Sequence, residues 1–298
     1  MDRSADEYRQ GVVCALGCYL IWGLFPLYWF PITDSGIGAD QILAQRICWS
    51  AVFAVLVLLW KQQGGALRRV LCDFKLLTTF IFSSLAITLN WLVYLWAITH
   101  NHILDASLGY FISPLVNVVF GRIFFGETLN RYQRFSVLAA LTGILWLALP
   151  AGHLPWVSLL LAGSFGVYGL LRKLAPVDAL TGMTLEALLM LPFALVYLGY
   201  AALQGTLVFA QLSGLQMSVL IGSGVVTVVP LLLFAAAAKW ISMGDLGMVQ
   251  YLGPSLQFGL GLTLFGEAFS LQKFTGYAWV WLGVALYIWG AVRDTPKR

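Results

Sequence analysis

Two charged side chains lie inside long apolar stretches of the sequence, where charges are rare. Arg46 falls in the stretch 41–60 and Glu186 in the stretch 181–202. An arginine at the centre of a membrane helix costs about 2.5–3.5 kcal/mol on insertion scales, so it faces the protein interior and meets a partner or a solute. Since a guanidinium binds a carboxylate through two parallel hydrogen bonds, we predict that Arg46 binds a substrate carboxylate. Glu186 would bind an amine or carry a coupling proton; the alternative for both is a structural role near lipid head groups.

Polar residues recur at helical spacing in two other apolar stretches. At intervals of four and three residues, which place them on one helix face, stand Tyr110, Pro114 and Asn117 and, later, Gln250, Pro254 and Gln257. Each proline removes a backbone donor and frees a carbonyl one turn earlier, which kinks a helix. Freed carbonyls at membrane depth are tolerated where they line protein or a water-filled cavity. We predict that the polar members bind substrate and that the prolines are hinges; helix packing is the alternative.

Further aromatic and amide groups are candidates to complete the site. Asn90 and Tyr94 lie one turn apart in the stretch 75–99, and we include both among the substrate-binding residues. Trp22 and Tyr168 each precede a glycine, and their rings are candidates to stack on an organic solute or to close over it. Packing in the core or in an interfacial belt is the alternative for each ring.

These residues must be positioned by membrane-spanning helices. The chain has 298 residues, of which 60% are hydrophobic and 10% charged, with a mean hydropathy of +0.85. A soluble domain carries roughly 25% charged residues, and about 20 apolar residues match the hydrocarbon core of a bilayer. Ten stretches approach that length: about 10–30, 41–60, 75–99, 105–125, 134–150, 154–171, 181–202, 216–238, 246–265 and 274–292. We therefore predict an all-α, polytopic membrane protein with ten transmembrane helices.

The basic residues predict how these helices are oriented. With the N-terminus inside, fifteen of the 17 Lys and Arg residues fall on one face: Arg3, Arg9, Lys61, Arg68, Arg69, Lys75, Arg122, Arg131, Arg134, Arg172, Lys173, Lys239, Arg293, Lys297 and Arg298. Only Lys273 falls on the opposite face, and Arg46 lies within a helix. Because basic loops stay in the cytoplasm, we predict that both termini are cytoplasmic. The net charge of +4 needs no nucleic-acid partner to explain it.

The two halves of the chain repeat each other at an offset of 140 residues. The segments 108–114 and 248–254 align, and the same offset pairs Arg46 with Glu186, Asp105 with Asp245, Gly121 with Gly261, Phe125-Gly126-Glu127 with Phe265-Gly266-Glu267, and Gly143 with Gly283. We predict two repeats, 1–150 and 151–298, of five helices each. Five is odd, so the second repeat would cross the membrane inverted, related to the first by a pseudo-two-fold axis in the membrane plane. Paired residues would then exchange roles as a central site opens to one side and then the other.

Other chemistries lack the residues that they need. His100, His102 and Asp105 fall in a short loop without a further ligand, so we predict no metal site. The four cysteines lack the spacing and polar partners of a disulfide framework or zinc site. Without a Walker A motif we expect neither direct ATP coupling nor an ATPase subunit. Glu127 and Glu267 are predicted to be structural, each capping the helix that follows. An intramembrane enzyme acting on a lipid-linked substrate is an alternative class, but it would require an acid, base or metal set at one depth.

Taken together, these residues resemble the EamA branch of the drug/metabolite transporter superfamily. The similarity extends over nearly the whole chain and is most specific in the stretches 46–50, 90–102, 106–112, 114–117, 126–127, 181–186 and 250–254. It implies a ten-helix carrier of a bacterial inner (plasma) membrane, built from inverted five-helix repeats, that moves amino acids, other metabolites or drugs. Asp105 stands where the resemblance leads us to expect glutamate.

The sequence therefore predicts a secondary active transporter rather than an enzyme. Its substrate would be a small metabolite, an amino acid or a similar zwitterion, moved by alternating access. A drug or toxic-compound exporter is the alternative. We expect a small-molecule substrate and membrane lipid as its partners, no nucleic acid, no cofactor, and a proton as the candidate coupling ion.

Overall fold

The computed structural model describes residues 5–33, 35–100, 102–148, 156–266 and 269–293, and within these ranges the chain is helical without a β-strand. The α-helices are α1 (Ala5–Gly23), α2 (Phe25–Trp29), α3 (Ala39–Trp60), α4 (Gly64–Cys72), α5 (Phe74–Thr99), α6 (Ile103–Phe125), α7 (Arg131–Ala148), α8 (Trp156–Leu174), α9 (Ala179–Leu203), α10 (Gly214–Trp240), α11 (Met243–Gln250), α12 (Leu252–Thr263) and α13 (Leu271–Arg293). In the described ranges, the 3-10 helices η1 (Phe30–Ile32) and η3 (Phe209–Gln211) lie in connections. The predicted all-α class is confirmed.

Over the residues that the structure describes, eight of the ten predicted apolar stretches each correspond to one helix, and the first and ninth are each broken into two helices. The structure also contains one helix that was not predicted. The chain bends by 41° between α1 and the segment Phe25–Ile32, where Pro26 occupies the first turn of α2. The ninth stretch breaks at Tyr251 between α11 and α12. The addition is α4, which is too short to span a bilayer and packs Val70 against a small apolar cluster.

Six helices of the described chain are long and apolar enough to cross a membrane: α3, α5, α6, α8, α9 and α10. The bent pair from Ala5 to Ile32 adds a seventh if it is counted as one span. The chain is therefore a multi-pass membrane protein. The helices α7 and α13 and the α11–α12 pair are not among these spans, so the count of ten spans stays a prediction.

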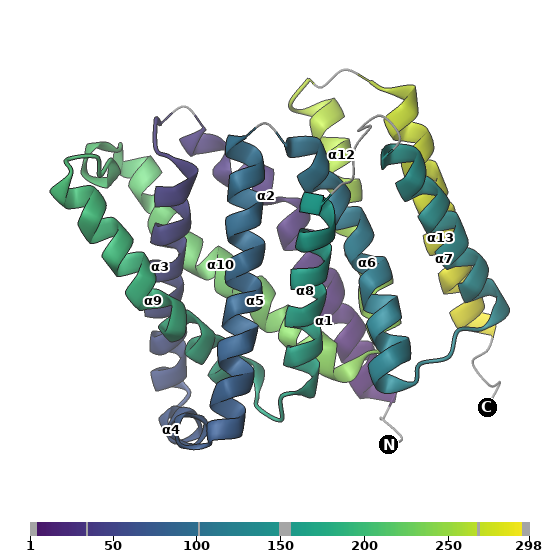
Figure 1. The fold of residues 1–298 in the computed structure, drawn as a ribbon, viewed down its shortest axis with the longest axis horizontal. Helices are drawn as coiled ribbons and strands as arrows, with labels where there is room; N and C mark the ends of the chain where they lie inside the picture. The colour runs from purple at the N-terminus through teal and green to yellow at the C-terminus, as the bar shows by residue number, and fades with distance from the viewer. Residues whose placement is uncertain (1–4, 34, 101, 149–155, 267–268, 294–298) are drawn as a thin grey trace.

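The helices lie side by side as a bundle with two clear ends (Figure 1). We call the end where α1 begins and α13 finishes the terminal end; the short helix α4 lies there too. The opposite end, where α3 begins and α5 passes into α6, is the distal end. The first residue of α1 and the last residue of α13 thus lie on the same side of the bundle.

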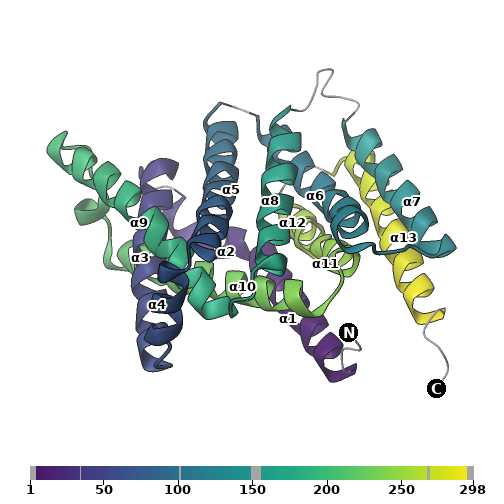
Figure 2. The same cartoon turned by 60° about the horizontal axis from the view of Figure 1, so that its bottom comes forward.

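The helices α7 and α13 form a close pair at one edge of the bundle, side by side in both views (Figures 1 and 2). A β-carbon on Gly143 of α7 would lie 2.6 Å from the carbonyl oxygen of Gly276 in α13. Reciprocally, a β-carbon on Gly283 of α13 would lie 2.8 Å from the carbonyl oxygen of Ser136 in α7. The offset of 140 converts the first contact into the second, as an inverted duplication predicts. The repeat boundaries 1–150 and 151–298 themselves remain a prediction.

Candidate solute-binding site

Arg46 lies in the distal half of α3, with most of its hydrogen-bonding capacity unused. Its Nε donates to Thr227 Oγ1 of α10 at 3.3 Å. The guanidinium carbon lies over the rings of Phe25, Trp29 and Trp91, at 5.9, 5.6 and 5.3 Å from their centroids. Across the described ranges, no carboxylate lies within 4.0 Å of it, and both terminal nitrogens lack an acceptor. An aromatic enclosure of this kind holds a guanidinium while leaving its terminal N–H groups available.

Tyr94 of α5 and Tyr110 of α6 stand together beside Arg46. Their rings meet edge to face at a centroid distance of 5.9 Å. Both side chains are more than a third exposed, at 37% and 38%. Tyr28, Tyr94 and Tyr110 contribute to the electrostatic surroundings of the guanidinium. Arg46 and the two tyrosines, which we predicted to bind substrate, are therefore brought together on an accessible surface.

Gln257 of α12 is also accessible, but it lies apart from the tyrosines. Its Nε2 donates to the backbone oxygen of Trp22 in α1 at 3.2 Å, and the side chain is otherwise exposed. Within the part of the chain that the structure describes, no hydrogen bond or ring contact joins Gln257 to Arg46. Its predicted role in substrate binding is therefore not supported by direct proximity in this state.

The remaining amides of the predicted site are buried between helices. Asn117 of α6 is 0% exposed and donates through Nδ2 to Gln250 Oε1 of α11 at 3.1 Å. The Nε2 of Gln250 donates to Ser113 Oγ at 2.9 Å. Asn90 of α5 donates to the backbone oxygen of Leu161 in α8 at 2.8 Å. All three amides join neighbouring helices here, as the packing alternative predicts.

Glu186 lies in the terminal half of α9 and is only 2% exposed. Its Oε1 accepts a hydrogen bond from Ser83 Oγ of α5 at 2.5 Å, and its Oε2 accepts one from the Tyr168 hydroxyl of α8 at 3.3 Å. The Nη1 of Arg172, also on α8, lies 3.8 Å from Oε1. Arg172, which we predicted on the face of the basic residues, lies near the terminal end of α8, but its side chain is 1% exposed. The available signal was its spacing: Arg172 lies four residues after Tyr168, on the same face of α8.

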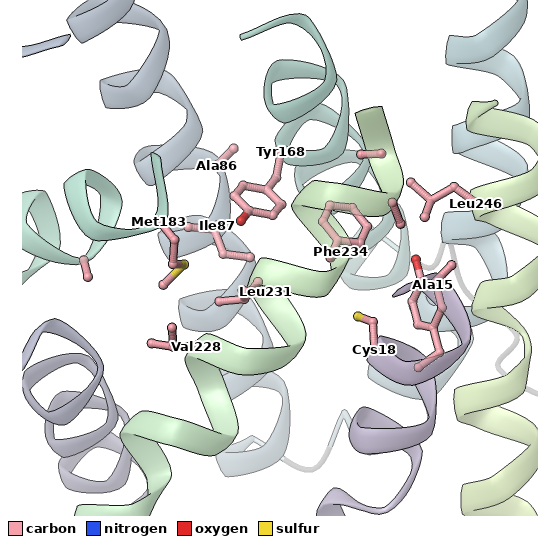
Figure 3. Close-up of a cluster of buried hydrophobic side chains, with 14 of the residues drawn as sticks. Ala15, Cys18, Ala86, Ile87, Tyr168, Met183, Val228, Leu231, Phe234 and Leu246 are labelled. Atoms are coloured by element: carbon pink, nitrogen blue, oxygen red, sulfur yellow. The ribbon is translucent and has the colours of Figure 1, made fainter. Parts of the chain in front are cut away.

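Arg46 and Glu186 do not share one cavity in this state. They occupy opposite halves of the bundle, and the packed residues around Tyr168 and Phe234 belong to the terminal half (Figure 3). In this state the charged residues of the predicted site fall in two clusters, and their roles in binding substrate stay predictions. The Arg46 cluster comprises Arg46, Thr227, Tyr94 and Tyr110, and the Glu186 cluster comprises Glu186, Ser83, Tyr168 and Arg172.

The two predicted hinge prolines differ in their effect on the backbone. Pro254 occupies the first turn of α12, directly after the break at Tyr251. Pro114 lies inside α6, which continues through it as one helix. The carbonyl of Pro114 packs against α11, since a β-carbon on Gly247 would lie 2.6 Å from it. Only Pro254 coincides with a broken helix in this state.

Glu127 caps a helix of the other half rather than the helix that follows it. Its Oε1 and Oε2 accept from the backbone N–H groups of Met243 and Gly244, at 2.7 and 3.0 Å. These groups open α11, where a carboxylate also interacts favourably with the helix dipole. The expected capping of α7 is thus replaced by a bond between the two halves. Its repeat partner Glu267 lies outside the described residues.

Two hollows of the surface are lined by residues other than those of the predicted substrate site. An apolar hollow of about 640 Å³ is lined by Asp40, Leu92, Val93, Leu95, Trp96 and Trp156 near the distal end. A polar hollow of about 390 Å³ is lined by Tyr8, Thr128, Leu129, Asn130, Gln133, Asp245 and Ala291 near the terminal end. The site is therefore defined by chemistry and exposure rather than by the volume of a pocket. Of the predicted loop ligands, His102 Nδ1 lies 2.9 Å from Asp105 Oδ2, and in the described part of the chain no three potential ligands gather.

Known proteins share both the sequence and the fold of this chain. The profile of the EamA-like transporter family matches residues 9–149. Protein RarD of Escherichia coli (strain K12) is 40% identical to this chain, over 99% of this chain and 100% of RarD. The chain belongs to the EamA-like transporter family. Its similarity to RarD places this EamA transporter in the RarD group, and the predicted resemblance to the EamA branch is confirmed.

Two further proteins agree with this assignment. An uncharacterized transporter of Pseudomonas aeruginosa is 42% identical to this EamA transporter, over 99% of each chain. A solved structure described only as the crystal structure of a protein matches with a TM-score of 0.71, covering 94% of this chain and 98% of that one. Because its sequence identity is 16%, it supports the fold alone.

Proposed function

We propose that this EamA transporter is a secondary carrier of a small zwitterionic metabolite, an amino acid or a close analogue. It would work by alternating access in a bacterial inner membrane, crossing it ten times with both termini in the cytoplasm. The observation that carries the proposal is a difference in exposure at five residue pairs related by the offset of 140.

Five such pairs surround the two clusters: Tyr28 and Tyr168, Arg46 and Glu186, Tyr94 and Phe234, Tyr110 and Gln250, and Gln257 and Asn117. In each of these five pairs the distal member is partly or fully exposed, whereas the terminal member is at most 5% exposed; the pairs Ser83–Ser223 and Ile87–Thr227 are buried on both sides. A carrier with inverted repeats has this asymmetry in any one state, because one half closes while its counterpart opens. Exchange of the two arrangements would present the opposite end. The pairs support alternating access with the distal end open.

The Arg46 cluster supports a zwitterion as the solute. The terminal nitrogens of Arg46 match a carboxylate, which accepts two parallel hydrogen bonds from a guanidinium. The accessible rings of Tyr94 and Tyr110 stand beside it, and aromatic faces attract an ammonium group within about 6 Å. An α-amino acid carries both groups one carbon apart. Its small size also suits a site between two rings and a guanidinium.

Counterflow in proteoliposomes tests the proposal. The purified protein is loaded with an unlabelled amino acid, and uptake of each member of a panel of radiolabelled amino acids is measured. Wild type should show saturable exchange, Arg46→Ala should lose it, and Arg46→Lys should retain a part because the charge remains without the planar fork. Exchange retained by Arg46→Ala would demote Arg46 to a structural anchor. Folded wild type that exchanges no amino acid would overturn the proposed substrate class.

A further inference from the structure

Arg172 is a buried guanidinium with two nitrogens that lack a hydrogen-bond acceptor. It lies near the terminal end of α8 and is 1% exposed. Its Nη2 donates to the backbone oxygen of Ala179 at 3.1 Å, and its carbon lies 5.4 Å from the centroid of Phe80. The Nε and Nη1 nitrogens have no hydrogen-bond partner. Such unmet donors are uncommon inside a protein, because a buried polar group without a partner is destabilising.

The nearby carboxylate does not remedy this deficit. The distance of 3.8 Å from Arg172 Nη1 to Glu186 Oε1 is too long for a hydrogen bond. Glu186 instead accepts from the hydroxyls of Ser83 and Tyr168. The carboxylate is therefore satisfied by hydroxyl groups, whereas the guanidinium is left with unused donors. What this cluster lacks is an anion, and a planar one would suit the fork of Arg172.

Two ammonium groups lie near Arg172, together with the carboxylates of Glu186 and Asp178. Lys173 Nζ donates to the backbone oxygens of Ala238 and Ile241 at 2.7 and 2.5 Å. Lys239 Nζ donates to the backbone oxygen of Val177. Both ammonium groups are thus held in place at the ends of α8 and α10, beside the α8–α9 connection. Fixed cations around an opening attract anionic solutes and anionic groups of larger ones.

The geometry points to Arg172 as the carboxylate contact of the terminal end, the counterpart of Arg46 at the distal end. When the terminal end opens, Arg172 moves away from Glu186 and binds the solute carboxylate through Nε and Nη1, while Glu186 receives the ammonium. In the closed end these two side chains partly neutralise each other. This inference rests on the proposed function, since it assigns the second contact of the same carrier.

Exchange kinetics measured separately from each face test the inference. The protein is reconstituted in one orientation, and the probes are the amino acid that exchanges in the counterflow panel and its carboxamide, which lacks the carboxylate. Inhibition constants of both are measured on each face for wild type, Arg172→Gln and Arg172→Lys. Arg122→Gln is the matched control, because Arg122 is an exposed arginine near the same end, on α6.

We expect Arg172→Gln to weaken inhibition by the amino acid at the terminal face by about tenfold or more. Inhibition by the carboxamide should be unchanged, so the preference for the amino acid falls at that face alone. Arg172→Lys should show a smaller shift of the same kind, and Arg122→Gln none. If Arg172→Gln does not fold, the lysine variant decides.

Other outcomes would overturn the inference. An equal loss for amino acid and carboxamide would assign Arg172 a purely structural role. An unchanged preference in a folded variant would remove Arg172 from the binding site while wild-type exchange keeps the proposed function. Absence of amino-acid exchange in wild type would remove the proposed function and this inference with it.

Discussion

The Arg46 cluster and the Glu186 cluster occupy equivalent places in the two halves, yet one is accessible and the other is buried. Beside Arg46, the ring of Tyr94 is 37% exposed. Its repeat partner beside the Glu186 cluster is Phe234, which is 0% exposed and stacks on Tyr168 at a centroid distance of 5.7 Å. Figure 3 shows these two rings packed together among buried side chains of α1, α8 and α10. The same positions thus form an open wall at one end and a sealed core at the other.

The difference also concerns how each charge is compensated. Burying a charge is tolerable only when a partner and further hydrogen bonds accompany it. Glu186 has such partners within the chain: Ser83, Tyr168 and Arg172. In the described part of the molecule, Arg46 forms no ion pair with a carboxylate. Closing the distal end buries Arg46, which then needs the carboxylate of a bound solute as its counter-ion. We therefore expect exchange of bound solutes to be faster than return of the unloaded carrier.

Removing one charge of the terminal cluster should have the largest effect on stability. Glu186→Gln leaves the buried Arg172 without a carboxylate, and breaking a buried pair in this way costs about 3–5 kcal/mol. We expect a fall in the thermal midpoint in detergent of roughly 6 °C or more. Arg172→Gln combined with Glu186→Gln should recover a substantial part, because neither charge is then stranded. A double variant as unstable as the sum of the two singles would show that the charges do not interact.

Glu186→Gln also separates coupling from exchange. If Glu186 carries the coupling proton, the variant should lose proton-driven accumulation while some exchange remains. The measurement is uptake driven by an imposed pH gradient, with counterflow by the same preparation as the control. Full accumulation by a folded Glu186→Gln protein would remove Glu186 from the coupling role.

The difference in accessibility can be measured directly at one pair of equivalent positions. In a background without Cys14, Cys18, Cys48 and Cys72, the variants Tyr94→Cys and Phe234→Cys are exposed to a membrane-impermeant maleimide. Tyr94→Cys should react about 100-fold faster, which corresponds to an opening free energy of about 2.7 kcal/mol at the closed end. Labelling of both from opposite faces at equal rates would show that the two states are equally populated.

The contact between α7 and α13 offers a test of the two-fold relation itself. Gly143→Ala and Gly283→Ala each force a β-carbon toward a backbone oxygen of the opposite helix. Overpacking of this kind costs about 1–3 kcal/mol, and the two variants should lose similar amounts because their contacts are equivalent. Gly163→Ala is the matched control, since a β-carbon there meets nothing within 4 Å. Thermal unfolding in detergent measures all three, and a loss confined to one of the pair would contradict the equivalence.

The sequence predicted the helices well because the length of an apolar stretch is a local property. The stretch 41–60, for example, became α3 (Ala39–Trp60) nearly residue for residue. The sequence analysis did not predict α4, since a nine-residue amphipathic helix has no such length and depends on packing of Val70 against its neighbours. The sequence analysis also did not predict that Glu127 caps α11, because the two segments are far apart in the sequence and no local motif links them.

The candidate site was predicted in part for a related reason. The accessible grouping of Arg46, Tyr94 and Tyr110 agrees with their predicted roles. The sequence analysis did not predict Arg172 as a site residue, because a basic residue in the last turn of a helix is typical of a cytoplasmic helix end. No sequence pattern can tell which end is closed, since one sequence encodes both states of a carrier.

The smallest expected effect is a difference in thermal stability between alanine variants of Asn117 and of its repeat partner Gln257. Asn117→Ala removes a donor from the buried Gln250 Oε1, which costs about 1 kcal/mol or somewhat more. Gln257→Ala removes one hydrogen bond from an exposed side chain to the Trp22 backbone, and surface substitutions usually stay within about 0.5 kcal/mol. Thermal unfolding in detergent compares the two. If solute or a mutation traps the terminal end open, the order should reverse, because Asn117 then becomes accessible while Gln257 is buried. An order that never changes between the trapped states would contradict the exchange of roles between the two halves.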